Sequence, residues 1–137
     1  MTRLSPYLRF DGNCKEAMTF YKDCLGGEIT IQTIGETPMA KEMPADKQNL
    51  VMHAMVKKGD LEFYAADMMR DPLKMGENVS LCLNCDSEEE IRKLFAAFGQ
   101  GGEVFSPLEV QFWGSLFGVL TDKYGIEWMF NYDMPKK

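Results

Sequence analysis

Long apolar runs are missing from this sequence of 137 residues, although 45% of its residues are hydrophobic. No stretch approaches the roughly 18 consecutive apolar residues that a membrane-spanning helix needs. Positive charge is also scarce, because 15 Lys and Arg residues stand against 21 Asp and Glu, for a formal net charge of −6. Nucleic-acid-binding proteins normally present a basic face to the phosphates. We therefore expect no membrane insertion and no nucleic-acid binding.

Two further signals are missing. The amino terminus lacks the apolar segment and cleavage site of a secretory signal, so we expect a cytoplasmic protein. Cys82 and Cys85 have the two-residue gap of a zinc knuckle, but the sequence holds only four cysteines and no second pair of this kind. Cys14 and Cys24 fall in a helical pattern. We interpret all four as free thiols that behave as small apolar residues.

Two segments have the spacing of a helix with one buried face. In residues 12–25 the apolar positions recur at intervals of three, four and seven, and residues 87–98 repeat them at an offset of 74. Asn13 is the expected cap of the first helix, and Asp86 or Ser87 that of the second. The two apolar sets are Ala17, Phe20, Tyr21 and Cys24, then Ile91, Leu94, Phe95 and Phe98.

The motif Gly-Gly-Glu follows each helix, at Gly26 and again at Gly101. Its offset of 75 residues indicates one inserted residue in the second turn. Paired glycines supply the positive φ with which a helix often ends, so we interpret the motif as the start of the next strand in each copy.

Strand patterns surround both helices. One precedes each helix, and three follow it. The sequence therefore predicts an α+β fold of two βαβββ units, about 1–70 and 77–137, joined by a linker at 71–76. Residues 35–49 are either a surface loop or a flap over a site. The expected strands are 4–10, 29–34, 50–56 and 61–66, then 79–83, 104–105, 117–121 and 126–132.

The resemblance to a known family rests on four fragments in order: PYLRFDGNCKEAMTFY (6–21), VMHA (51–54), WGSLFG (113–118) and TDKYGIEW (121–128). Together they resemble the vicinal oxygen chelate superfamily of glyoxalases, extradiol dioxygenases and bleomycin-resistance proteins, and within it the PhnB-like group. The resemblance implies a single domain of two βαβββ units whose curved mixed sheets surround a concave pocket. It also implies a homodimer and an unknown small molecule as ligand.

Strand alternation predicts which side chains face that pocket. A two-residue turn at Lys58-Gly59 would place Met55 opposite Glu62 and His53 opposite Tyr64, on a mixed face whose reverse is wholly apolar. In the other strands Leu4, Val79, Trp128 and Phe130 are expected among the buried residues. Trp113 either lines the pocket or anchors a loop. The predicted ligand-binding residues are Tyr7, Arg9, His53, Met55, Glu62, Tyr64, Ser80, Cys82, Trp113, Phe117, Glu127 and Met129.

Metal-dependent members of the superfamily hold a divalent ion with about four His, Glu or Gln ligands. Aligned with them, this chain has Tyr7 or Pro6, then Glu62, Ser80 and Met129. Only Glu62 is a usual ligand, and His53 would make a second. We therefore expect no cofactor. The alternative is a metal-dependent lyase, isomerase or dioxygenase, with Glu127 as a ligand if the last strand slips by one residue.

His53 and Glu62 are the catalytic candidates. His53 could serve as a general acid or base beside Glu62, or it could only bond Tyr64 or a backbone carbonyl. Glu62 needs a partner, for which Arg9, His53 or a ligand cation is expected. PhnB-like sequences are often described as demethylubiquinone methyltransferases, but no glycine-rich turn for S-adenosylmethionine is present. A small-molecule-binding protein is the predicted function, and whether it is an enzyme stays open.

Overall fold

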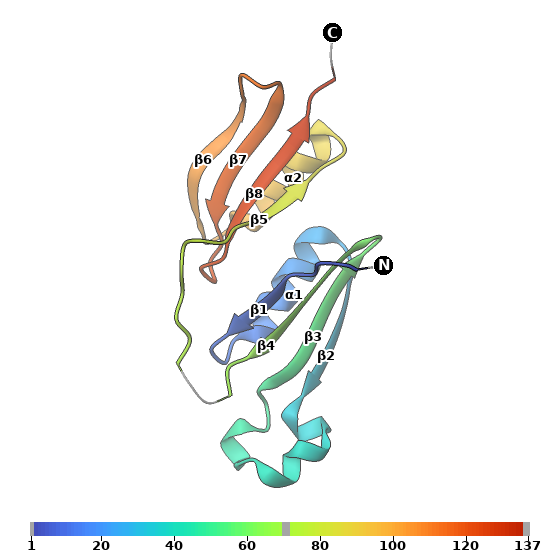
Figure 1. Cartoon of the computed structure of the whole chain (residues 1–137), viewed down its shortest axis with the longest axis vertical. Coiled ribbons are helices and arrows are strands. Elements are labelled where there is room, and N and C mark those ends of the chain that lie inside the picture. The colour runs from blue at the N-terminus through green and yellow to red at the C-terminus, as the bar shows by residue number, and fades with distance from the viewer. Residues whose placement is uncertain (1, 70–71, 136–137) are drawn as a thin grey trace. The chain divides into compact units, whose positions relative to one another are not determined.

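The computed structural model describes residues 2–69 and 72–135, in two compact units, Met1–Lys74 and Met75–Lys137 (Figure 1). Each unit has the predicted order of strand, helix and three strands. Unit 1 contains β1 (Tyr7–Phe10), α1 (Cys14–Leu25), β2 (Glu28–Thr33), β3 (Val51–Lys58) and β4 (Leu61–Asp67). Unit 2 contains β5 (Leu81–Asn84), α2 (Glu88–Phe98), β6 (Glu103–Val110), β7 (Ser115–Thr121) and β8 (Glu127–Asp133).

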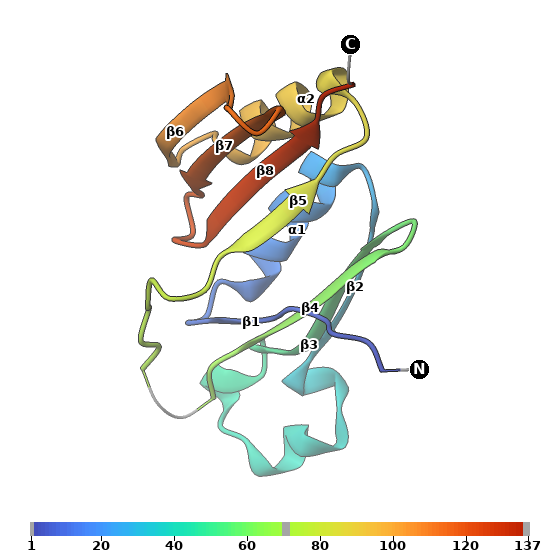
Figure 2. The same cartoon turned by 45° about the horizontal axis from the view of Figure 1, so that its top comes forward.

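Both units build the same four-stranded sheet, with order β1-β4-β3-β2 in unit 1 and β5-β8-β7-β6 in unit 2. The strand before each helix pairs parallel with the last strand of its unit, and the remaining pairs are antiparallel. Figure 2 shows β4 beside β1 and β8 beside β5. Short turns join β3 to β4, β6 to β7 and β7 to β8, whereas residues 34–50 join β2 to β3. The parallel neighbour of β1 or β5 is reached only after the helix and two further strands. The predicted α+β class and mixed sheets are confirmed.

The core of unit 1 lies between α1 and one face of its sheet. Ala17, Met18 and Tyr21 of the helix are fully buried, and the Tyr21 ring lies 6.0 Å from that of Phe63. Ala54, Val56, Phe63 and Ala65 give this sheet face the apolar character predicted for it. Phe20 and Cys24, expected in the buried stripe, are only half-buried. All four cysteines are free, and burial raises the pKa of the Cys14 thiol to about 12.

Unit 2 repeats this packing. Ile91, Leu94 and Phe98 are buried under α2, and Trp128 and Phe130 of β8 lie against them as predicted. The Phe98 ring is 4.8 Å from Trp128 and 5.6 Å from Phe130, in the edge-to-face geometry that aromatic pairs favour.

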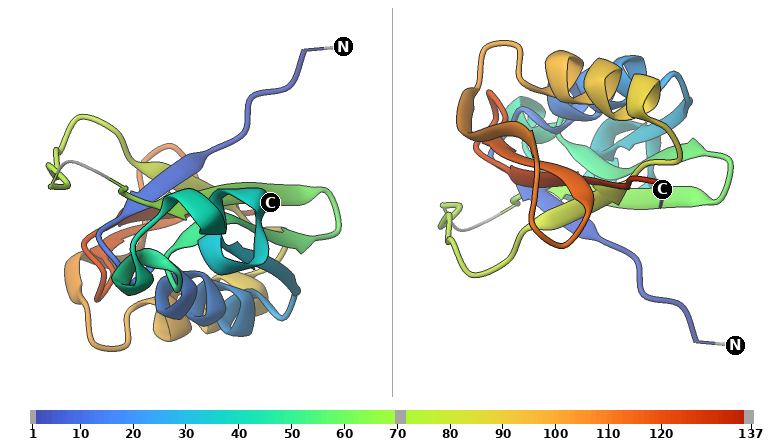
Figure 3. Two further views of the ribbon diagram at one scale, coloured as in Figure 1. Left: turned by 90° about the horizontal axis from the view of Figure 1, so that it is seen from below. Right: turned by 90° about the horizontal axis from the view of Figure 1, so that it is seen from above.

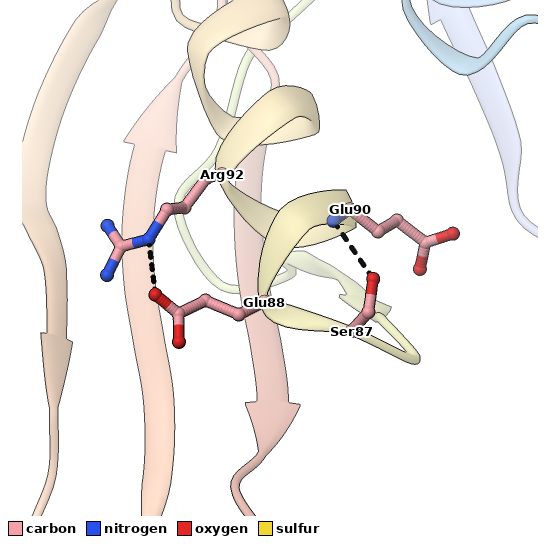
Figure 4. A network of polar contacts seen from close by, with 4 residues as sticks. All are labelled: Ser87, Glu88, Glu90 and Arg92. Carbon is pink, nitrogen blue, oxygen red and sulfur yellow. Dashed lines mark hydrogen bonds and ion pairs between the residues drawn. The ribbon is translucent and has the colours of Figure 1, made fainter.

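The two helices begin differently. The Ser87 hydroxyl accepts a hydrogen bond from the backbone N–H of Glu90, and Arg92 pairs with Glu88 one turn away at 2.8 Å (Figure 4). Ser87 is therefore the predicted cap. Asn13 makes no capping bond through its side chain. Its place is taken by Asp67 at the end of β4, whose Oδ1 accepts the N–H groups of Gly12 at 3.0 Å and Cys14 at 2.9 Å.

The two glycines of each Gly-Gly-Glu motif have separate roles. The first, Gly26 or Gly101, has a φ of 73°. The second lies against the neighbouring strand, because a Cβ on Gly27 would stand 2.4 Å from the carbonyl oxygen of Lys57 and one on Gly102 2.3 Å from that of Thr121. In unit 1 Gly26 of the motif caps α1 directly, whereas α2 is capped by Gly99 and the motif begins two residues later at Gly101. The one-residue insertion predicted from the offsets of 74 and 75 therefore lies between the end of α2 and Gly101.

Several strand boundaries differ from those predicted. Residues 2–5 extend away from the unit 1 sheet (Figure 3), and Leu4 is 99% exposed instead of buried. Val79 is 72% exposed because β5 begins only at Leu81. The strand expected at 104–105 is the longer β6. A short apolar pattern at a strand's start therefore did not carry enough information to show where pairing begins.

Residues 34–47 form three 3-10 helices, at Ile34–Glu36, Pro38–Glu42 and Ala45–Lys47. The Gln48 amide donates to the carbonyl oxygens of Ala40 and Met43, at 3.0 Å each, and so closes this excursion. In the expected linker, residue 71 lies outside the described residues, and residues 72–76 have no helix or strand. No helix in the described part of the chain is long and apolar enough to cross a membrane.

Candidate functional site

The hairpin of β3 and β4 turns at Gly59-Asp60 and not at Lys58-Gly59. Lys58 pairs with Leu61, so Met55 lies opposite Tyr64 and Lys57 opposite Glu62. The predicted pairs of Met55 with Glu62 and of His53 with Tyr64 are therefore wrong by two residues. A shift of two keeps every side chain on its face of the sheet, so the predicted mixed face is still formed.

Tyr7, His53 and Tyr64 lie together on this face. Tyr7 of β1 pairs with Tyr64 of β4, and their rings stack with centroids 6.2 Å apart. The His53 ring lies 5.5 Å from Tyr64 and 6.3 Å from Tyr7. Tyr7 is 47% exposed, and the other two are half-buried. We call these three residues the aromatic platform.

Arg9 and Glu62 flank the aromatic platform. The guanidinium carbon of Arg9 lies 4.4 Å from the centroid of the Tyr7 ring, a cation–π contact. The Tyr64 hydroxyl donates a hydrogen bond to Oε1 of Glu62. This bond raises the pKa of Tyr64, with smaller contributions from desolvation and the Glu62 charge. Tyr64 therefore stays a hydrogen-bond donor, and a tyrosine hydroxyl is the partner of Glu62 in place of the expected cation.

Sequence reasoning missed two neighbours of the aromatic platform on β2. Gln32 pairs with His53, and Thr30 pairs with Met55, so both share the platform's face of the sheet, and both are exposed. Their alternation with Ile29 and Ile31 is the signal that could have found them. Thr30 and Gln32 supply polar groups beside the predicted residues His53 and Met55.

The predicted residues of unit 2 also gather on one face of its sheet. Cys82 pairs with Met129, and Ser80, just before β5, donates a hydrogen bond of 2.5 Å to Glu127. Phe117 pairs with Asn131, and Trp113 in the turn before β7 lies 5.9 Å from the Phe117 ring. Trp113 is 53% exposed and also contacts Phe112. Desolvation raises the pKa of Cys82, which leaves it a weakly reactive thiol.

His53 and Glu62 are poorly placed to hold a divalent metal ion together within unit 1. Since Lys57 pairs with Glu62, His53 lies four residues from that pair, about 13 Å along the strands at ~3.3 Å per residue. His53 and Glu62 therefore do not converge as a chelating pair. In residues 2–69 and 72–135 no three His, Cys, Asp or Glu side chains gather as a metal site would require. Tyr7, Ser80 and Met129 are poor donors for a hard divalent ion.

Comparison with known proteins gives the family. Residues 2–130 match the family described as 3-demethylubiquinone-9 3-methyltransferase. The chain belongs to this family. Protein YjdN of Escherichia coli (strain K12) is 31% identical in an alignment 137 positions long that covers 93% of this chain and 93% of that one.

Two solved structures are similar to this protein over nearly its whole chain. Protein PA1353 from Pseudomonas aeruginosa is 36% identical with a TM-score of 0.88, and the match covers 98% of this chain and 100% of that one. A putative 3-demethylubiquinone-9 3-methyltransferase from Bacillus cereus, a PhnB protein, is 29% identical with a TM-score of 0.77, covering 96% and 99%. The fold is also that of a glyoxalase/bleomycin resistance protein/dioxygenase family enzyme, at 13% identity and a TM-score of 0.60. The PhnB-like resemblance is thus confirmed.

Proposed function

We propose that this family member binds a small, flat molecule on the aromatic platform. The observation that carries the proposal is the grouping of Tyr7, His53 and Tyr64 from three different strands on one partly exposed face. Aromatic side chains left open to solvent on a rigid sheet offer stacking surface without the entropy cost of ordering flexible groups. Gln32 and Arg9 at its edges supply a polar amide and a positive charge for orientation.

The proposal includes the absence of the superfamily's catalytic divalent ion. Glu62 is the one usual ligand among the aligned positions, and its carboxylate accepts the Tyr64 hydroxyl. His53, the second donor, lies too far along the strand to join it in unit 1. A hard ion held by one carboxylate would not repay its dehydration. A metal-dependent lyase, isomerase or dioxygenase is the alternative, and metal analysis separates the two.

Methyl transfer, which the family description names, has no support from the residues. S-adenosylmethionine is commonly held by a glycine-rich turn between a strand and a helix. The two strand-to-helix turns of this chain, residues 11–13 and 85–87, hold one glycine between them, Gly12. They do not fit that cofactor, and we assign no methyl transfer to the chain.

We also propose a homodimer. Its grounds are the resemblance to the PhnB-like group and the frequency of symmetric dimers among proteins. Light scattering coupled to size-exclusion chromatography measures it directly. A mass of one chain at micromolar concentration would overturn the dimer without affecting the ligand site in unit 1.

Ligand-induced thermal shift tests the binding proposal. Neutral planar aromatics such as quinoline and indole should raise the melting temperature, because a ligand selective for the folded state stabilises it. The increase should be lost in Tyr64→Leu, measured against the ligand-free variant. It should persist in Phe105→Leu, an aromatic replacement at an 82% exposed position of β6. No shift with any compound, or equal shifts in wild type and Tyr64→Leu, would refute the proposal.

A further inference from the structure

A groove runs along unit 1 beside Arg9. Its larger part has a volume of about 640 Å³ and is lined by Arg9, Met68, Pro72, Leu73 and Lys74. A smaller part of about 230 Å³ shares Arg9 and Met68 and reaches Tyr7 of the aromatic platform. We call the two parts together the Arg9 groove. Their combined size is in the range of small-molecule sites.

The two cations of the Arg9 groove have no acidic partner among the described residues. The ion pairs of the described residues join Lys22 to Asp23 and Arg92 to Glu88, and neither pair includes Arg9 or Lys74. Asp67 also borders the groove, but it is 3% exposed and its two oxygens accept three backbone N–H groups. The described lining of the groove thus carries two cations and one carboxylate already occupied by backbone N–H groups, which favours an anionic ligand over a cationic one.

The position of Arg9 suits a carboxylate. Its guanidinium carbon lies 4.4 Å from the centroid of the Tyr7 ring, a cation–π contact that restrains the side chain. A guanidinium presents its N–H groups in the fork geometry that matches a carboxylate with two parallel hydrogen bonds. Lys74 adds a second charge without directional demands.

The rest of the Arg9 groove is apolar. Met68, Pro72 and Leu73 line the larger part, and Met52 and Met69 the smaller. Methionine side chains adapt to aliphatic chains of different shape. Lys47 donates a hydrogen bond of 3.0 Å to the carbonyl oxygen of Met69 and so fixes the chain where it leaves β4. The lining therefore fits an aliphatic body attached to the anionic group.

We propose that the Arg9 groove binds a small aliphatic carboxylate, with its carboxylate on Arg9 and its chain along Met68 and Leu73. This assignment goes beyond the proposed function, because it gives the groove beside the aromatic platform an anionic, aliphatic ligand of its own. The probe is sodium octanoate, with octanamide as its uncharged analogue and acetate as the headgroup alone.

Isothermal titration calorimetry tests the assignment. Octanoate should bind at least tenfold more tightly than octanamide or acetate, since only octanoate has both charge and chain. Arg9→Gln should weaken octanoate about tenfold and Lys74→Gln about threefold, both with less salt dependence. Arg92→Gln and Lys93→Gln, exposed cations of α2, are the matched controls and should change the Kd less than twofold.

Equal binding of octanoate and octanamide, or an unchanged Kd in Arg9→Gln, would overturn the assignment. Quinoline separates this result from failure of the proposed function. If quinoline binds and octanoate does not, the carboxylate assignment alone is wrong. If neither binds, both proposals are wrong.

Discussion

Asp67 links three segments of unit 1 through one carboxylate. Its Oδ1 accepts the N–H groups of Gly12 and Cys14 at the start of α1, and its Oδ2 accepts that of Val51 at the start of β3, at 2.9 Å. The donors lie between 16 and 55 residues away along the chain. In unit 2, Asp133 at the end of β8 accepts the hydroxyl of Ser115 at the start of β7, while the start of α2 is capped by Ser87 instead. Among the described residues, the three-way joint that Asp67 makes therefore belongs to unit 1.

Replacing Asp67 with Asn should lower the free energy of unfolding by about 3 kcal/mol, because the amide nitrogen cannot accept a hydrogen bond and leaves a buried N–H unpaired. Urea denaturation measures this change. Asp60→Asn, at an exposed position of the β3–β4 turn, is the control and should remain within about 0.5 kcal/mol of wild type. A loss in Asp67→Asn no larger than that of the control would show that the three bonds contribute little.

At the scale of secondary-structure elements, sequence patterns predicted helices and sheet faces better than pairing. Helical spacing located α1 and α2 within two residues, since each buries a stripe along its whole length. The turn KKGD permitted two registers. Gly59, with a φ of 57°, occupies the first central position of the turn, where a type II′ turn requires glycine. The error of two residues in the register left each side chain on its predicted face of the sheet, because side chains alternate with a period of two. It made the predicted closeness of His53 and Glu62 wrong.

The aromatic platform was only partly predictable for the same reason. Alternation placed Tyr7, His53 and Tyr64 on one face, but contact between β1 and β4 depends on the sheet order, which no local pattern contains. The role of Asp67 was missed because its donors are far away in the sequence. The groove beside Arg9 needs the path of residues 72–74, for which the sequence has no periodicity.

The second glycine of each Gly-Gly-Glu motif should tolerate no side chain. Gly27→Ala would place a Cβ 2.4 Å from the Lys57 carbonyl oxygen, so β2 and β3 must separate. We expect a loss of about 2–4 kcal/mol in the free energy of unfolding. Gly102→Ala should behave alike in unit 2, where the Thr121 carbonyl oxygen is at 2.3 Å.

Thermal or urea unfolding of Gly76→Ala provides the matched control. Gly76 has no positive φ, and its nearest neighbour is the end of the Asn78 side chain at 3.3 Å, which can move. A Gly27→Ala protein as stable as Gly76→Ala would contradict the close approach of the two strands.

At the scale of the whole molecule, the chain is a duplicated βαβββ unit that keeps the superfamily's fold while the aligned ligand positions hold Tyr7, Ser80 and Met129. Elemental analysis of protein purified without chelator should therefore find well below one divalent ion per chain. A stoichiometric ion that disappears in Glu62→Ala would establish the metal-dependent alternative. The same ion in wild type and variant would point to ligands other than Glu62.

Titration of isotope-labelled protein with quinoline, followed by ¹H–¹⁵N nuclear magnetic resonance, tests whether the aromatic platform of unit 1 is the ligand site, because each backbone amide reports its own surroundings. We expect the largest saturable shifts at Tyr7, His53 and Tyr64, with smaller ones at Gln32. Saturable shifts confined to the exposed aromatic residues of unit 2, such as Phe112 and Trp113, or no saturable shifts at all, would contradict it.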